Sequence, residues 1–281
     1  MTTVIHVQTR TRAPISLWVG FAIISVALLV AILAPLIAPY AQSAIVGSPY
    51  ESPGSHLLGT DLVGRDLLSR LIYGTRLTII VSLAATSIGF VIGVAIGFVA
   101  AELRGGVETA IIWFIDTLLS FPPLLLGLVI IAALGADLTL LIVTIAIVHV
   151  PRVARIARSI AANVASMQFV DAARARGEGL ISIVWREILP NTLRPLAVEF
   201  GLRFSYAVLY ASSLSFLGLG IQPPDADWGS MVRENMNALQ VGVVMPILAP
   251  ALCIGILAVG VNLVADRFAG EHSRKLPEEL R

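Results

Sequence analysis

Six long apolar runs constrain the fold of this 281-residue chain more than any other feature of its sequence. A helix needs about 20 mostly apolar residues to cross the hydrocarbon core of a bilayer. Runs that reach this length lie roughly at 17–38, 77–101, 109–134, 138–157, 196–219 and 243–264. Only 13% of the residues are charged, against about 25% in an ordinary soluble domain. The sequence therefore predicts an all-α polytopic membrane protein with six transmembrane helices.

The first apolar run follows Arg10 and Arg12, so a cleaved signal peptide and a retained membrane anchor both have to be considered. A signal peptide has an apolar core of roughly 7 to 15 residues. The run at 17–38 is longer than that. We therefore expect it to be a retained transmembrane helix.

The arginines are distributed unevenly between the connections, and cytoplasmic loops collect Lys and Arg. If the amino terminus lies inside, only Arg65, Arg70, Arg76 and Arg233 fall outside the cell. The cationic residues then placed in the cytoplasm are Arg104, Arg152, Arg155, Arg158, Arg174, Arg176, Arg186, Arg194, Arg267, Arg274 and Lys275. This distribution predicts a multi-pass protein of the cell membrane with both termini cytoplasmic.

Three of these arginines, Arg152, Arg155 and Arg158, recur every three residues at the end of the fourth run. Long cationic side chains at such a place can reach the lipid headgroups while their stems stay in the apolar layer. We interpret them as membrane anchors.

The largest predicted cytoplasmic loop, at about 161–194, has helical order of its own. The alanine-rich stretch 161–176 favours a helix, and Gly177 is suited to the left-handed conformation that ends one. A second short helix is predicted over 180–188 and should end at Pro190. Spacing alone leaves two interpretations open. The loop is either a projecting segment that binds another protein, with Ala172 and Ala173 as a small-residue contact surface, or an amphipathic segment at the membrane surface without a partner.

Ionisable side chains inside apolar runs are costly and therefore mark candidate pathway residues. Glu199 and Arg203 are four residues apart and can pair on one helical face. The polar residues in the runs either line a pathway or form buried structural contacts, and for this pair we favour the structural role. The candidates are Asp116, His149, Glu199, Arg203, Ser212 and Ser215.

Two further patterns predict packing rather than chemistry. Gly89, Gly93 and Gly97 repeat every four residues in the second run, which favours the close approach of another helix. Before that run, Asp61, Arg65, Asp66 and Arg70 alternate in charge. They are compatible with a solvated surface helix whose ion pairs contribute only about 0 to 1 kcal/mol each.

Several enzyme classes are excluded by what the sequence lacks. A phosphate-binding loop needs a lysine after a glycine, and the single lysine, Lys275, follows Arg274. The histidines have no paired metal-ligand spacing, so we expect no metal site. A serine protease would need His149 near Ser212, Ser213 or Ser215, and no glycine-framed nucleophile surrounds them. We expect a non-catalytic chain that holds no cofactor.

Three stretches resemble one known family. Asp171-Ala172-Ala173, Gly177 and Ile188-Leu189-Pro190 resemble the EAA loop of the membrane subunits of ATP-binding-cassette (ABC) importers, with Asp171 in place of the usual glutamate. The stretches HLLGTDLVGRDLLSRLIYGTRLTI (56–79) and SFLGLGIQPPDADWGSMV (215–232) are similar to signatures of the dipeptide, oligopeptide and nickel permease group, specifically its C-type subunit. Together these motifs span most of the chain.

The resemblance implies the transmembrane domain of a type I ABC importer at 77–266. Residues 1–76 would form a cytoplasmic amino terminus, a first membrane helix and an extracytoplasmic segment, and 267–281 a cytoplasmic tail. The implied partners are a homologous second permease, one or two ABC ATPase subunits, which hold the ATP and magnesium, and an extracytoplasmic substrate-binding protein. The EAA-like residues would couple the pathway to the ATPases.

The implied cargo is a di- or oligopeptide, and nickel or another small solute is the alternative. A stand-alone secondary transporter is a rival of a different class. It would call for an inverted repeat or broken helices around a midplane site. The sequence has no clear internal repeat, and the EAA-like loop would then serve no purpose.

Overall fold

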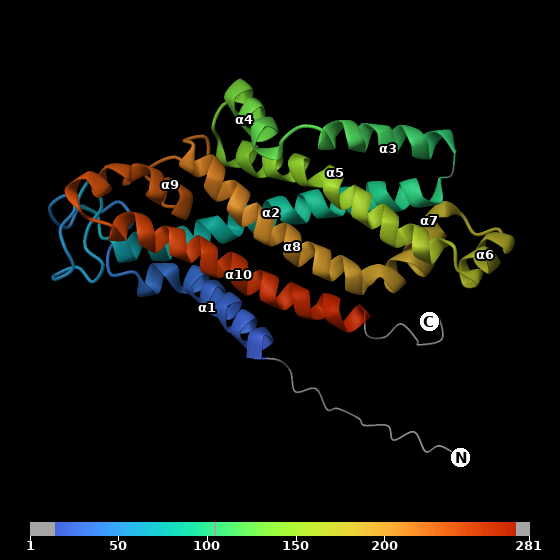
Figure 1. The fold of residues 1–281 in the computed structure, drawn as a ribbon, viewed down its shortest axis with the longest axis horizontal. Helices are drawn as coiled ribbons and strands as arrows, with labels where there is room; N and C mark the ends of the chain where they lie inside the picture. Colours follow the sequence, from blue (N-terminus) through green and yellow to red (C-terminus); the bar gives the residue numbers. More distant parts are fainter. Residues whose placement is uncertain (1–14, 104, 274–281) are drawn as a thin grey trace, which may run out of the picture.

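The computed structural model describes residues 15–103 and 105–273 of the chain (Figure 1). Within these ranges the regular structure is helical, apart from two isolated antiparallel bridges, Ile45 with Arg65 and Thr60 with Asp66. Residues that entered the sequence argument but lie outside the described ranges are Arg10, Arg12, Arg104, Arg274 and Lys275.

Four helices are long and apolar enough to cross a membrane, and they run roughly along the long axis of the molecule (Figure 1). Their bounds are α1 Ile15–Ile37, α2 Leu67–Glu102, α5 Leu138–Ala165 and α10 Met245–Ser273. The helix α2 therefore begins ten residues before the apolar run at 77–101. Asp66 starts it by accepting a hydrogen bond from the backbone N–H of Ser69 at 2.8 Å.

The third predicted span is a broken one. It consists of α3 (Gly106–Leu119) and α4 (Pro123–Leu134), which meet at an angle of 84°. Pro122 is extended, with φ −57° and ψ 126°, because the following proline disfavours the helical conformation there. Pro123 then starts α4, where its missing N–H costs nothing. The run at 109–134 is thus two helices, because Pro122 and Pro123 override its apolar character.

The helix α8 (Leu189–Phe216) covers the predicted span at 196–219. It is less apolar than the other spans because it carries Glu199 and Arg203. It packs against α2, α5 and α10, so much of its polar face is enclosed by protein instead of lipid.

The centre of the bundle is the pair α2 and α5, which approach closely at Gly89, Gly93 and Gly97. A Cβ atom added at these glycines would lie 2.8 Å from the carbonyl oxygen of Ala146, 2.6 Å from Cβ of Val153 and 2.5 Å from the carbonyl oxygen of Ala154. No side chain fits in these gaps. The close helix approach predicted from the glycine repeat is confirmed.

A buried ionic network closes the end of the bundle that holds α9 (Trp228–Glu234). Arg70 Nη1 lies 2.6 Å from Asp61 Oδ2 and 2.7 Å from Glu234 Oε2. Arg65 contacts the same two carboxylates, each at 2.7 Å. Arg70 and Asp61 are 0% exposed. The expectation of a solvated surface helix with weak ion pairs was wrong, because Glu234 arrives from a distant part of the chain and encloses these charges.

The network sets the ionisation of Asp61. Burial alone would raise the pKa of this carboxyl. The backbone N–H of Arg65 donates a hydrogen bond to it, and the charges of Arg65 and Arg70 lie beside it; together they hold its pKa below the ordinary value. Asp61 is therefore a stable anion at neutral pH.

Candidate functional site

A short helical segment projects from the opposite end of the bundle (Figure 1). We call residues 166–188 the tip segment; it contains α6 (Gln168–Ala175), α7 (Leu180–Ser182) and the π-helix η1 (Ile183–Ile188). The predicted continuous helix at 161–176 is interrupted after Ala165. Ser166 caps α5 there, its hydroxyl donating to the carbonyl of Asn163 at 2.9 Å, and Met167 is extended.

Gly177 ends α6 as predicted. Its φ of +80° is left-handed, its N–H donates to the carbonyl of Arg174 at 2.9 Å, and the N–H of Glu178 donates to that of Ala173 at 3.2 Å. These two bonds are the pattern of a helix closed by a left-handed glycine. No other atom lies within 4 Å of the position that a Cβ would take, so only the backbone conformation demands glycine here.

Pro190 does not end the second helix, contrary to the prediction. In η1 the N–H of Leu189 donates to the carbonyl of Val184, five residues back, and Pro190 stands in the first turn of α8. A wide π turn shifts the hydrogen-bond register, so a proline without an N–H can follow without a break. The tip segment therefore continues directly into a transmembrane helix.

The EAA-like residues divide between two faces. Ala173 is completely buried beside Val170, in a cluster with Phe98 of α2 and Ala161 of α5, whereas Ala172 and Asp171 are exposed. Ala172 and Ala173 do not form one small-residue surface, because adjacent positions on a helix point in different directions. Of the remaining residues, Gly177 and Pro190 are exposed, Leu189 is half-buried and Ile188 is buried.

Arg174 fastens the tip segment to the bundle. Its Nε and Nη2 donate to the two carboxylate oxygens of Glu102 at 3.0 and 2.8 Å, and its Nη1 reaches Asp171 at 2.7 Å and the carbonyl of Ala165 at 3.0 Å. The hydrogen bond to Glu102 raises the pKa of Arg174 above its ordinary value. Sequence reasoning missed this role, because Glu102 is 72 residues away and no local spacing connects the pair.

The outer face of the tip segment exposes large apolar side chains. Ile181 is 72% and Trp185 65% exposed, and Phe169 is also exposed. The same segment carries charged residues, including the ion pair of Arg176 with Glu178 at 2.7 Å. Aromatic and aliphatic side chains with a polar rim are typical of a surface that docks another protein.

The predicted pairing of Glu199 and Arg203 is confirmed, with Oε1 and Nε 2.6 Å apart and both residues buried. The guanidinium of Arg203 also lies 5.0 Å from the ring centroid of Tyr206. His149, on α5, faces the ring of Tyr210 at 6.5 Å. These residues form one polar region between α5 and α8.

Ser212 and Ser215 lie elsewhere on α8, packed against the chain at 220–229. Ser215 Oγ accepts a hydrogen bond from the N–H of Ile221 at 3.3 Å, and a Cβ at Gly229 would collide with the backbone of Ser212. Within the described residues, no hydrogen bond joins His149 to a serine, and no three His, Cys, Asp or Glu side chains are grouped to hold a metal ion.

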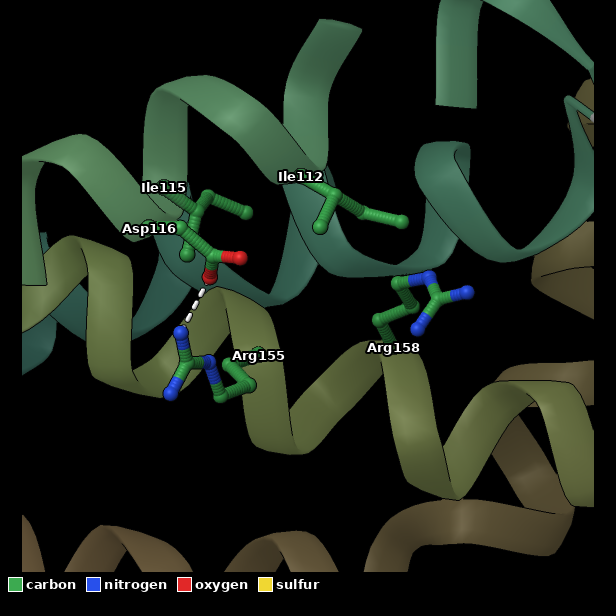
Figure 2. Close-up of a pocket in the computed structure, with 5 residues that line it drawn as sticks. All are labelled: Ile112, Ile115, Asp116, Arg155 and Arg158. Carbon is green, nitrogen blue, oxygen red and sulfur yellow. Dashed lines mark hydrogen bonds and ion pairs between the residues drawn. The ribbon is translucent and has the colours of Figure 1, made fainter. Parts of the chain in front are cut away.

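Two ion pairs hold α3 against α5 beside a cavity of about 230 Å³ (Figure 2). Asp116 pairs with Arg155, and Glu108 pairs with Arg158. Figure 2 shows Asp116 directed at Arg155 across the gap between the two helices. The sequence analysis did not foresee these carboxylate partners of Arg155 and Arg158, which lie on a neighbouring helix.

Comparisons with known proteins give a consistent result. Residues 89–276 match the family described as binding-protein-dependent transport system inner membrane component. The chain is 34% identical to the dipeptide transport system permease protein DppC of Alkalihalophilus pseudofirmus, over 88% of this chain and 82% of that protein. It is 35% identical to the di/tripeptide transport system permease protein DppC of Pseudomonas aeruginosa, over 84% and 80%. The fold matches a chain of the MetNI methionine ABC transporter in an inward-facing conformation with a TM-score of 0.61 and 18% identity, over 73% of this chain and 97% of that one.

Proposed function

The chain belongs to the family of binding-protein-dependent transport system inner membrane components, and on that premise we propose that it forms half of the pathway of an ATP-driven peptide importer. It is a multi-pass, non-catalytic permease subunit. The names of its relatives, which are dipeptide and di/tripeptide transport permeases, support a short peptide as the cargo.

The observation that carries the proposal is the construction of the tip segment. It exposes an apolar surface with a charged rim, and it is bound to α2 through Arg174 and Glu102 and continuous with α8 through η1. A partner that moves this surface therefore moves two transmembrane helices directly. We assign the exposed residues, including Asp171 and Ala172, to ATPase contact, and the buried Ala173 and Ile188 to the transmission of that movement.

In this scheme two ABC ATPase subunits bind the tip segments of this chain and of a homologous second permease. ATP and magnesium are held by the ATPases, and this chain holds no cofactor. An extracytoplasmic binding protein delivers the peptide at the end that carries α9. The tip segment, with Arg174, Arg176 and Arg186, faces the cytoplasm, which places both termini there as well.

The exposed Ala172 of α6 provides the test. Ala172→Arg adds a long cation to the exposed face and should prevent the ATPases from co-purifying with the tagged chain, while the second permease is retained. The matched control is Ala136→Arg, an exposed alanine between α4 and α5, at the end of the bundle away from the tip segment. Each variant is extracted from its native membrane, and the bound proteins are identified by mass spectrometry. Retention of the ATPases by Ala172→Arg would contradict the proposal.

A further inference from the structure

The helix α3 is only loosely packed against the rest of the bundle. Of its 14 residues, all of which the structure describes, Ile115 alone is buried. The side chains of Asp116 and Arg155, which pair across to α5, are 52% and 56% exposed. Exposed pairs of this kind contribute little to holding two helices together. The packing of α3 therefore depends on what fills the space beside it.

A groove of about 540 Å³ lies between α3 and the pair α2 and α5. We call it the α3 groove; it is a second space beside α3, next to the smaller cavity of Figure 2, with which it shares Ile115. The side chains that line it are all apolar and come from three membrane-spanning segments; they include Ile96 and Val99 of α2, Ile111, Ile115 and Leu118 of α3, and Pro151 of α5. Such walls give water no hydrogen-bond partners, so the occupant of the groove has to be apolar.

The dimensions of the α3 groove restrict what can occupy it. It follows α3 from Ala110 to Leu118, which is about 12 Å at about 1.5 Å per residue, and one leaflet supplies about 15 Å of hydrocarbon. Its volume spread over that length gives a mean cross-section of about 45 Å², whereas a helix about 10 to 12 Å across needs about 80 to 110 Å². A helix of another subunit is therefore too wide. An extended peptide would bring unpaired backbone N–H and C=O groups into an apolar space.

We propose that the α3 groove binds the acyl chains of a membrane phospholipid, which complete the packing of α3 against α2 and α5. The α2 wall, from Ala95 to Val99, lies next to Glu102, which binds the tip segment, so the lipid belongs to the leaflet on that side of the membrane. Flexible hydrocarbon adapts to a narrow apolar space and supplies the close contacts that the side chains of α3 leave unmade. Binding of this kind requires only that the chain spans a membrane, so it does not depend on the peptide cargo.

The first experiment locates retained lipid on the complete importer. The importer is incubated with a phosphatidylcholine that carries a diazirine in one acyl chain, freed of loosely associated lipid by gel filtration, and illuminated. Mass spectrometry should find Ile96 and Ile111 labelled about tenfold more than Leu252 and Val259, which are exposed on the outer face of α10, because bound lipid survives the filtration. Equal labelling of the two faces overturns the proposal. Labelling of the groove only when the second permease is left out also overturns it and assigns the groove to that subunit. If no partner subunits co-purify, the importer is refuted, and the same labelling of the chain alone still establishes the lipid site.

The second experiment fills the groove. Ala95→Trp combined with Ala110→Trp occupies it from the walls on α2 and α3 and should remove about one phospholipid per chain from the purified protein, measured as lipid phosphorus. The matched control is Ala22→Trp combined with Ala251→Trp, two exposed alanines of α1 and α10 on the other side of the bundle (Figure 1), and it should keep the lipid. Equal lipid contents of the two double variants overturn the proposal.

Amide hydrogen exchange of the wild type reports on α3 without any substitution. Removal of lipid with detergent should accelerate exchange in α3 about tenfold relative to α10, and added phosphatidylethanolamine should reverse the change. Exchange in α3 that does not respond to the lipid overturns the proposal.

Discussion

Gly97 offers the sharpest test of how tightly the centre of the bundle is packed. In Gly97→Ala the new Cβ would lie 2.5 Å from the carbonyl oxygen of Ala154 and 2.8 Å from both Cβ of Ala157 and the backbone nitrogen of Arg158. Ordinary contacts begin at 3.4 Å. Two of the three atoms belong to the backbone, so no rotamer change relieves the overlap, and α2 and α5 have to separate by about 1 Å.

The matched control is Gly255→Ala on α10, where the added Cβ meets nothing within 4 Å. Both variants gain the intrinsic helix preference of alanine, which is about 1 kcal/mol. The difference between them therefore isolates the steric cost. Overpacking of a close interface costs about 1 to 3 kcal/mol, so we expect Gly97→Ala to be less stable than Gly255→Ala by that amount.

The assay follows thermal unfolding of the purified chain in detergent through its single cysteine, Cys253, which is partly buried and reacts with a fluorogenic thiol reagent as the bundle opens. Gly97→Ala should unfold several degrees below Gly255→Ala. Equal unfolding temperatures for the two variants would refute the reasoning, because the α2–α5 contact would then be loose enough to admit a methyl group.

Four other perturbations have definite expected results. Asp61→Asn leaves Arg65 and Arg70 with one buried carboxylate, so the same unfolding assay should show a loss of about 3 to 5 kcal/mol, and a loss below about 1 kcal/mol would contradict the network. Because the pKa of Asp61 is lowered from 3.8, the contribution of its carboxylate to the free energy of unfolding is present above about pH 4 and is lost as the pH falls further. Unfolding temperatures that already decline from pH 7 to pH 5 would contradict this assignment. Gly177→Val forces a branched side chain to a φ of +80°, so uptake should be lost while the protein stays inserted in the membrane, and normal uptake would show that the end of α6 has no coupling role. A cysteine at Ser182, in a Cys253→Ala background, should be labelled only from the cytoplasmic side, and labelling from outside would reverse the orientation.

Local patterns in the sequence predicted the parts of the fold that depend on neighbours in the chain. The apolar runs identified the four long spans and the broken one, the spacing of Glu199 and Arg203 gave their pairing, and Gly177 marked the end of α6. In each case the physical cause lies within one continuous stretch of the chain. The break between α3 and α4 also had a local signal, the prolines at 122 and 123, which the apolar character of the run concealed.

Contacts between distant parts of the chain were not predictable in this way. The residues near Arg70 do not indicate that it pairs with Glu234, and those near Arg174 do not indicate its pair with Glu102. A single sequence does not show which distant charged residues lie together in the fold. The π turn before Pro190 was missed for a related reason. A proline usually stops a helix, and only the altered register of η1 allows the chain to continue. The sequence alone also did not show which arginines of α5 pair with acids, because those acids belong to α3.

The two ends of α2 are held very differently. Near Leu67 the buried charges of Arg70, Asp61 and Glu234 lock it to α9, whereas near Glu102 it is joined to the tip segment by a pair that water can reach. With 36 residues at about 1.5 Å each, α2 is about 54 Å long. Each degree of tilt about the locked end moves the other end by about 1 Å. In the proposed importer, a tilt of a few degrees about the locked end displaces the end next to the tip segment by several ångströms.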